Sequence, residues 1–214
     1  MQTIAIISEG ITDQVFLEEL IFKCIEFDDE PEFIYAQPIR DATHEHTAPH
    51  GGWELVLEFC ELRMRDTLET NDFTIVQIDT DCGDHPNFGL ELSPGGVDKE
   101  DSDLIADTIE IIRSKISGDL LASYGDRLIF AVCVHSLETW IILSLYGETK
   151  KKSALNHLQR RVAEKGFKKN VESYLQLSKL LKTKDIAKRL NKAESMGVFL
   201  DDFCDKFDVC ALKF

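Results

Sequence analysis

Short runs of apolar and β-branched residues alternate along this chain with longer segments in which apolar residues recur at helical spacing. The short runs cover residues 3–7, 33–38, 73–79 and 128–134. Runs of this length and composition are typical of buried strands. The run at 128–134 is apolar throughout, as expected for a parallel strand that is covered on both faces. The pattern therefore predicts four strands.

The segments between these runs have the spacing of amphipathic helices. We predict a helix from Thr12, as its N-cap, to about Phe27, and further helices over 53–69 and 99–117, with Gly118 ending the last. Polar stretches with glycine and proline, 40–52 and 80–98, predict loops. The chain from about residue 136 onward has helical patterning.

Strands that alternate with helices indicate the α/β class, with a Rossmann-like, mostly parallel sheet flanked by helices. In such sheets the ligand site lies beyond the carboxyl ends of the strands. Acidic residues occur at these positions in three places. Glu9 follows the first strand, with Asp13 four residues on; Asp79 and Asp81 follow the third strand, and Glu138 follows the fourth.

We expect these five carboxylates to converge at one edge of the sheet. In an extended segment, side-chain alternation would also put Asp79 and Asp81 on the same side. Crowded carboxylates repel one another, and a hard divalent cation such as Mg²⁺ or Mn²⁺ relieves the repulsion. The alternative is structural: an acid after a strand is often a helix cap, and a lone D-x-D pattern is weak evidence. The joint pattern favours a metal site.

Charge is distributed unevenly along the chain, whose formal net charge is −15. Residues 1–149 contain 8 basic against 31 acidic residues, whereas residues 150–214 contain 16 against 8. We therefore predict an α/β domain over 1–147 and a helical, basic C-terminal extension over 148–214. The basic residues that we expect to bind nucleic-acid phosphates are Lys151, Lys152, Arg160, Arg161, Lys168 and Lys169. A solvated surface and a docking site for an acidic partner are the alternatives.

Several features concern the location of the protein. The six cysteines are scattered without a C-x-x-C pair, which favours reduced thiols over a disulfide framework or zinc ribbon. No apolar run reaches the ~18 residues of a membrane span, and the N-terminus has no basic secretory signal. We expect a cytoplasmic protein without a membrane partner.

Two short motifs resemble the Toprim domain of topoisomerases, primases and related nucleases. They are Ser8-Glu9-Gly10-Ile11-Thr12-Asp13, followed by an apolar helix, and Ile78-Asp79-Thr80-Asp81. The spacing Glu9-x-x-x-Asp13 and the pair Leu137-Glu138 are closer to the OLD-family nucleases. The resemblance covers about residues 1–145. OLD nucleases also carry an ATPase domain, which is not found in this sequence, so we expect any ATP-dependent control to come from another protein.

The resemblance implies phosphodiester chemistry with two divalent ions, Mg²⁺ or Mn²⁺. Asp79 and Asp81 would hold the principal ion, and Glu9 would share it or act as general acid or base. Asp13 and Glu138 would complete a second site. A basic residue downstream of the acids is expected to stabilise the transition state, and Lys150 is the nearest candidate.

The resulting hypothesis is a metal-dependent nuclease that cuts DNA rather than RNA, alone or as the effector of a bacterial phage-defence complex. A second hypothesis is a non-catalytic subunit that binds nucleic acid or a partner protein. A third is a metal-dependent phosphatase, although the D-x-D motif of the haloacid dehalogenase type follows the first strand. The loop residues His44, His46 and His50 could bind a transition metal or simply belong to a polar loop.

Overall fold

A parallel four-stranded sheet forms the centre of the fold. The computed structural model describes residues 1–39, 52–150, 152–162, 167–192, 194–207 and 210–213. The strands are β1 (Thr3–Ile7), β3 (Glu32–Gln37), β4 (Phe73–Asp79) and β5 (Leu128–Cys133), in the spatial order β3-β1-β4-β5. All neighbouring pairs are parallel, so their carboxyl ends meet at one edge. The predicted α/β class, with a parallel sheet flanked by helices, is confirmed.

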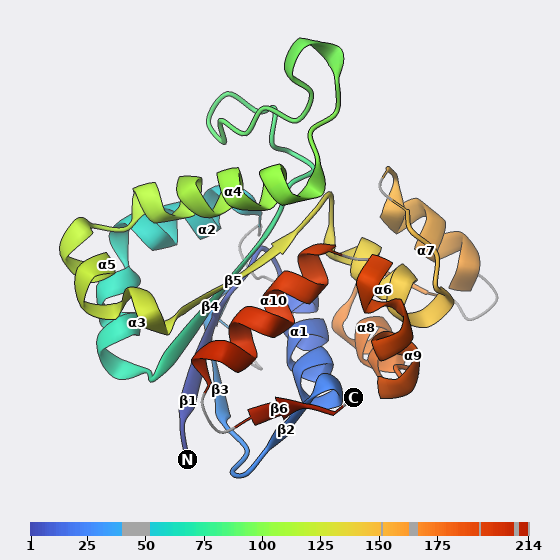
Figure 1. Cartoon of the computed structure of the whole chain (residues 1–214), viewed down its shortest axis with the longest axis horizontal. Helices are drawn as coiled ribbons and strands as arrows, with labels where there is room; N and C mark the ends of the chain where they lie inside the picture. The colour runs from blue at the N-terminus through green and yellow to red at the C-terminus, as the bar shows by residue number, and fades with distance from the viewer. Residues whose placement is uncertain (40–51, 151, 163–166, 193, 208–209, 214) are drawn as a thin grey trace.

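Helices cover both faces of the sheet (Figure 1). One face carries α1 (Ile11–Cys24), α6 (Leu137–Tyr146), α7 (Ala154–Val162), α8 (Val171–Ser178), α9 (Thr183–Arg189) and α10 (Glu194–Lys206). The other face carries α2 (Trp53–Leu62), α3 (Met64–Thr70), α4 (Asp101–Lys115) and α5 (Gly118–Tyr124). Short 3₁₀ turns occur at Pro94–Gly96, Gly125–Arg127 and Leu190–Lys192. The result is a three-layer arrangement with a separate apolar core on each side of the sheet.

The alternation of side chains along β4 decides which residues face the α1 layer. Ile75 belongs to the core beneath α1, whereas Val76 and Ile78 belong to the core beneath α2 and α4. Successive side chains of a strand point to opposite faces. Gln77 and Asp79 therefore follow Ile75 on the α1 side, near the carboxyl edge of the sheet.

The C-terminal helices share a core with the N-terminal part of the chain. Trp140 of α6 stacks on Phe199 of α10, with ring centroids 5.7 Å apart. Leu158 of α7 and Tyr174 of α8 are fully buried in the same cluster as α1. The boundary between 1–147 and 148–214 stays a prediction, but the helical extension packs directly on the α1 side of the sheet.

Both predicted boundaries of the first helix are wrong. The helix predicted from Thr12 begins at Ile11 with Gly10 as its N-cap, and it ends at Cys24. Its predicted last residues form strand β2 (Ile25–Phe27), which pairs antiparallel with β6 (Cys210–Leu212). Because β6 lies almost 190 residues away in the sequence, local patterning could not reveal this pair.

The two helices predicted on the other face also differ from the structure. The segment 53–69 divides at Arg63, whose backbone is not helical (φ −127°, ψ −1°). The segment 99–117 forms α4, which ends at Lys115. Gly118 was expected to end this helix, but it begins α5 after Ser117 instead. The apolar residues that recur at helical spacing in this segment are nevertheless in the core, since Ile105, Ile112 and Ile116 are buried.

Two expectations about location can be compared with the structure. Within the described residues, no helix has both the length and the apolar character that crossing a membrane requires. The cysteines at positions 24, 60, 82, 133 and 204 are free thiols.

Candidate functional site

Glu9 and Asp79 meet at the carboxyl edge of the sheet. Glu9 lies two residues beyond β1, and Asp79 is the last residue of β4. The Glu9 Oε1 atom accepts a hydrogen bond of 2.7 Å from the backbone N–H of Asp79. The two acids, 70 residues apart in the sequence, are therefore neighbours, as the strand-end argument predicted.

Gln77 holds both of these acids in place. Its Oε1 atom accepts a 3.1 Å hydrogen bond from the Glu9 backbone, and its Nε2 atom donates a 2.8 Å bond to Asp79 Oδ1. The backbone N–H of Leu137 donates to the same Asp79 oxygen at 3.1 Å. Sequence reasoning missed Gln77. The available signal was a single polar residue within the otherwise apolar segment Ile75–Ile78, and the structure shows that its side chain is fully buried.

Asp13 joins this group from the first turn of α1. Its side chain is only 6% exposed. The close approach depends on Gly10, because a Cβ atom at that position would lie 3.1 Å from Asp13 Oδ2. Asp13 interacts electrostatically with Asp79 and Glu138. The helix start thus brings a third carboxylate behind the Glu9–Asp79 pair.

Glu138 is close to the other acids but has partners of its own. It lies in the first turn of α6 and is 2% exposed. Its Oε1 atom accepts a 2.5 Å hydrogen bond from the Tyr174 hydroxyl and lies 3.5 Å from the Lys169 ammonium. Burial alone would raise the pKa of Glu138, but Lys169 and the hydrogen bonds from Tyr174 and Ser136 bring it below its ordinary value. Glu138 is therefore an ionised, paired carboxylate.

Asp81 lies on the exposed side of the group, and the alternation argument for it is wrong. Strand β4 ends at Asp79, and the chain then turns, with the Gly83 N–H bonded to the Thr80 carbonyl at 3.0 Å. Asp81 is consequently exposed, whereas Asp79 is partly buried. Its backbone N–H donates to the His135 carbonyl at 2.9 Å. Asp81 still contributes charge repulsion to Glu9 and Asp79.

A cleft of about 360 Å³ begins at Asp81. It runs between the loop that follows β4, the start of α4 and the turn at Lys152 and Ser153. His135 and Ser153, which both line it, have left-handed backbone conformations (φ 66° and 56°) that are unusual for non-glycine residues. Strained backbone of this kind clusters at functional sites. Of the five carboxylates, Asp81 is the one that lines this cleft.

We call Glu9, Asp13, Asp79 and Asp81 the acidic rim. Burial raises the pKa of Glu9 to about 8, and the charges of Asp13 and Asp81 contribute. Burial, with repulsion from Glu138, raises the pKa of Asp13 to about 7. Burial and the four neighbouring carboxylates raise the pKa of Asp79 well above its ordinary value. The rim therefore holds more negative charge than its surroundings stabilise.

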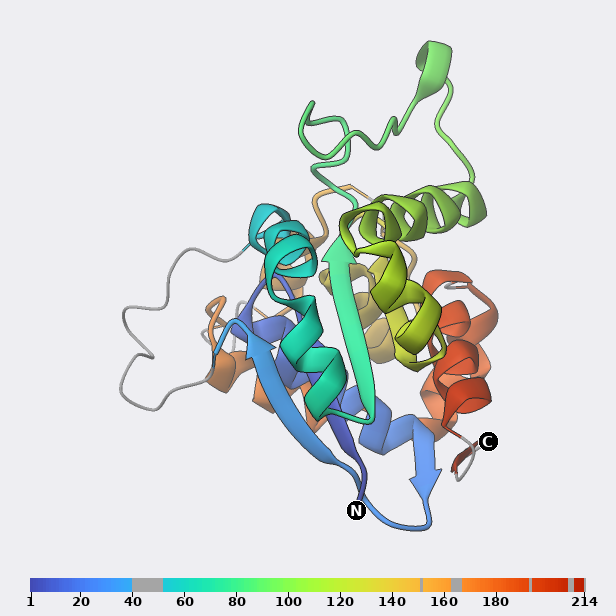
Figure 2. The same cartoon turned by 90° about the vertical axis from the view of Figure 1, so that its left-hand side faces the viewer.

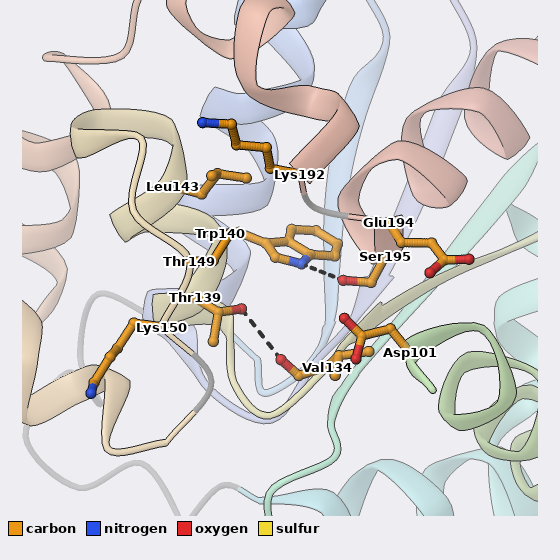
Figure 3. Close-up of a pocket in the computed structure, with 10 residues that line it drawn as sticks. All are labelled: Asp101, Val134, Thr139, Trp140, Leu143, Thr149, Lys150, Lys192, Glu194 and Ser195. Carbon is orange, nitrogen blue, oxygen red and sulfur yellow. Dashed lines mark hydrogen bonds between the residues drawn. The ribbon is translucent and has the colours of Figure 1, made fainter. Parts of the chain in front are cut away.

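Among the described residues, Lys169 rather than Lys150 is the lysine that interacts with these acids. Lys150 lines a small cavity of about 50 Å³ beside Trp140 and Thr139, and in Figure 3 its side chain points away from them. Lys169 pairs with Glu138 and interacts electrostatically with Asp13 and Asp79. Burial lowers the pKa of Lys169, but the attraction of these three acids outweighs burial and holds the pKa above its ordinary value. The structure thus favours Lys169 as the basic residue of the site.

The other predicted nucleic-acid contacts are partly engaged by acids. Lys152 lies 3.9 Å from Asp98, and Arg161 pairs with Glu148. Arg160 and Lys168 are exposed, whereas Lys151 lies outside the described residues. Part of the basic C-terminal segment therefore neutralises acids of the same chain, and a continuous phosphate track stays a prediction.

A divalent cation is compatible with the acidic rim. Among the described residues, no group of three or more histidine, cysteine or acidic side chains is placed so that it could hold a metal ion by itself. Mg²⁺, however, is usually bound by one or two carboxylates together with water and substrate phosphates. Glu9 and Asp79 each use one oxygen in the hydrogen bonds above, which leaves a second oxygen on each. His44, His46 and His50 lie outside the described residues.

Comparisons with known proteins add no further constraint on the activity. The resemblance to Toprim domains depends on Glu9, Asp13, Asp79, Asp81 and Glu138, which the structure brings to one edge of the sheet. No protein-family model, curated protein or solved structure matches the chain.

Proposed function

We propose that this protein is a divalent-metal-dependent nuclease that hydrolyses phosphodiester bonds of DNA at the acidic rim. The observation that carries the proposal is the convergence of Glu9 and Asp79. The Glu9 Oε1 atom lies 2.7 Å from the backbone nitrogen of Asp79. They come from different strands and meet where parallel sheets place their ligand sites. Phosphodiester hydrolysis is the activity that the Toprim-like motifs imply.

Glu9 and Asp79 would hold Mg²⁺ or Mn²⁺, with Asp81 on the side that opens into the cleft. A bound divalent cation polarises a phosphoryl oxygen and lowers the pKa of coordinated water. The raised pKa values of Glu9 and Asp13 support this use, because carboxylates that repel one another in a buried site gain most from a cation. A second ion at Glu138 would have to displace Lys169, so we propose one ion at Glu9 and Asp79.

The surrounding side chains would orient the reacting groups. Gln77 fixes the Glu9 backbone and the Asp79 carboxylate relative to each other. Glu138 and Tyr174 hold Lys169 beside the rim, and the Lys169 side chain is half exposed. An ammonium group in this position can stabilise the negative charge that develops on the phosphate in the transition state.

A second candidate function is a non-catalytic subunit that binds nucleic acid or a partner. Two observations favour it: the described residues contain no assembled group of three metal ligands, and Lys169 already compensates one of the carboxylates. In that case the acidic rim would have no catalytic role.

A plasmid-nicking assay with Mn²⁺ separates the two candidates. We expect the wild-type chain to nick supercoiled DNA in Mn²⁺ but not in EDTA, and Glu9→Gln to be slower by at least about a hundredfold. Glutamine retains an oxygen that can accept the Asp79 hydrogen bond, so the fold should be unaffected. Glu110→Gln, an exposed change on α4, is the matched control and should cut at the wild-type rate. Equal inactivity of all three folded chains would favour the binding subunit.

A further inference from the structure

Three aromatic rings gather beside the acidic rim. Trp53, the first residue of α2, stacks nearly parallel on Phe88, with centroids 5.1 Å apart and an interplanar angle of 8°. The His85 ring lies 5.2 Å from Trp53 and is tilted by 51°. Phe88 is 3% exposed, whereas Trp53 is half-buried and His85 is exposed. The cluster therefore has one buried ring, Phe88, and two rings that solvent can reach, Trp53 and His85.

Backbone hydrogen bonds connect this cluster to the rim on two sides. The N–H of Gly52, the residue before Trp53, donates to the Glu9 carbonyl at 2.9 Å. The N–H of His85 donates at 3.0 Å to the carbonyl of Cys82, which follows Asp81 directly. In Figure 2, the start of α2 and the loop that follows β4 lie at the same edge of the sheet. The exposed rings are thus held close to the carboxylates.

Core packing explains only part of this arrangement. Phe88 belongs to the core beneath α2 and α4, and Trp53 covers it. The His85 imidazole is exposed and lies outside that core; its Nδ1 atom accepts a 3.3 Å hydrogen bond from the Asn87 backbone N–H, which fixes the ring beside Trp53. Flat, accessible rings are the surfaces on which proteins stack unpaired bases, at a gain of ~1–3 kcal/mol per base.

The charge of the surroundings makes an uncharged attraction valuable. Residues 1–149, to which Trp53 and His85 belong, contain 31 acidic and only 8 basic residues, so this part of the chain offers little attraction for phosphate. Stacking does not depend on phosphate charge. It could therefore hold a nucleic acid beside the acidic rim where ion pairs could not.

We propose that Trp53 and His85 form a stacking site for an unpaired nucleobase, so that the substrate of the acidic rim is single-stranded nucleic acid. Bases inside a duplex are covered on both faces by their neighbours and cannot occupy such a site without unstacking. The inference builds on the proposed nuclease function and names its substrate class. DNA and RNA offer the same stacking chemistry.

Tryptophan fluorescence tests the stacking site directly, because the chain has two tryptophans and the other one, Trp140, is 1% exposed in the core. The wild-type chain without Mn²⁺ and the Glu9→Gln chain, neither of which should cut, are titrated with a short oligothymidylate. We expect quenching by this oligomer. An abasic oligomer of the same length and charge, and a duplex of the same length, should not quench. An oligouridylate arm shows whether RNA is also accepted.

Substitutions then assign the effect to the two rings. Trp53→Leu and His85→Ala should each weaken oligothymidylate binding by about tenfold, measured by anisotropy of a labelled oligomer. Trp53→Phe keeps a ring that can cover Phe88 and should bind much more tightly than Trp53→Leu. Tyr124→Leu is the matched control, since this half-buried aromatic lies at the end of α5, before the amino end of β5, and should not alter binding.

The results of binding and cleavage assays distinguish this inference from the proposed function. Quenching without any cleavage by the wild-type chain would support the stacking site and contradict the nuclease. Cleavage of relaxed duplex as fast as single-stranded circular DNA, or equal quenching by the abasic oligomer, would overturn the stacking site alone. Unchanged affinity in both Trp53→Leu and His85→Ala would also overturn it.

Discussion

Replacing Asp79 with asparagine should abolish metal-dependent cleavage and at the same time make the metal-free protein more stable. Asparagine has the shape of aspartate, and its Oδ1 atom can still accept the hydrogen bonds from Gln77 and Leu137. The substitution removes the negative charge and replaces the second carboxylate oxygen with an amide nitrogen. Because burial and neighbouring carboxylates raise the pKa of Asp79, that charge destabilises the folded state. A purely structural aspartate would behave in the opposite way.

The free energy of unfolding should therefore be higher for Asp79→Asn than for the wild-type chain. In a chain of this size, each gain of about 1 kcal/mol raises Tm by about 2–4 °C. The difference from wild type should grow as pH rises, since protonated Asp79 at low pH resembles asparagine. Thermal unfolding in EDTA, measured from acidic to neutral pH, tests the effect, with Glu110→Gln as the surface control. Destabilisation by Asp79→Asn, or normal cleavage, would contradict the proposed role.

Metal binding should become much tighter between pH 6 and pH 8 and should release protons. The pKa of Glu9 is about 8 and that of Asp13 about 7, so both carboxyl groups are largely protonated at pH 6. A cation held by Glu9 needs the ionised form of Glu9, and the positive charge of the cation also favours the ionised form of the neighbouring Asp13. Each proton that is released makes the affinity rise by up to about tenfold per pH unit, so the total gain should be about a hundredfold to a thousandfold.

The same shifts fix the sign of the stability change. The pKa of Glu9 is raised from the ordinary 4.5 to about 8, and that of Asp13 from 3.8 to about 7. Between the ordinary and the raised value of each group, the folded, metal-free protein therefore binds more protons than the unfolded chain. Its stability from these groups is complete below about pH 4 and is lost as pH rises toward 8. Calorimetric titration of Mn²⁺ in two buffers with different ionisation heats counts the protons. Glu9→Gln should release fewer, and a pH-independent affinity would argue against binding at the rim.

The position of the acidic rim could be predicted because it depends on a rule about topology. Apolar runs identified β1, β4 and β5, and parallel strands bring their carboxyl ends together, which was sufficient to join Glu9 to Asp79.

The finer arrangement could not be predicted, because it depends on contacts between distant segments. Whether Asp81 follows the alternation of β4 depends on where the strand ends, and β4 ends two residues earlier. Lys169 reaches Glu138 only because α8 packs against α1, and no sequence pattern indicates that packing. Lys150 was closer in sequence to the acidic motifs, but proximity along the chain does not determine proximity in space.

A crystal structure of the protein soaked in Mn²⁺, with the ion located by its anomalous scattering, tests the central claim most directly. We predict an Mn²⁺ peak at the carboxyl edge of the sheet, within ligand distance of carboxylate oxygens of both Glu9 and Asp79. An ion bound elsewhere, for example at His44, His46 and His50, with the rim carboxylates unliganded, would contradict the claim that these acids share a divalent cation.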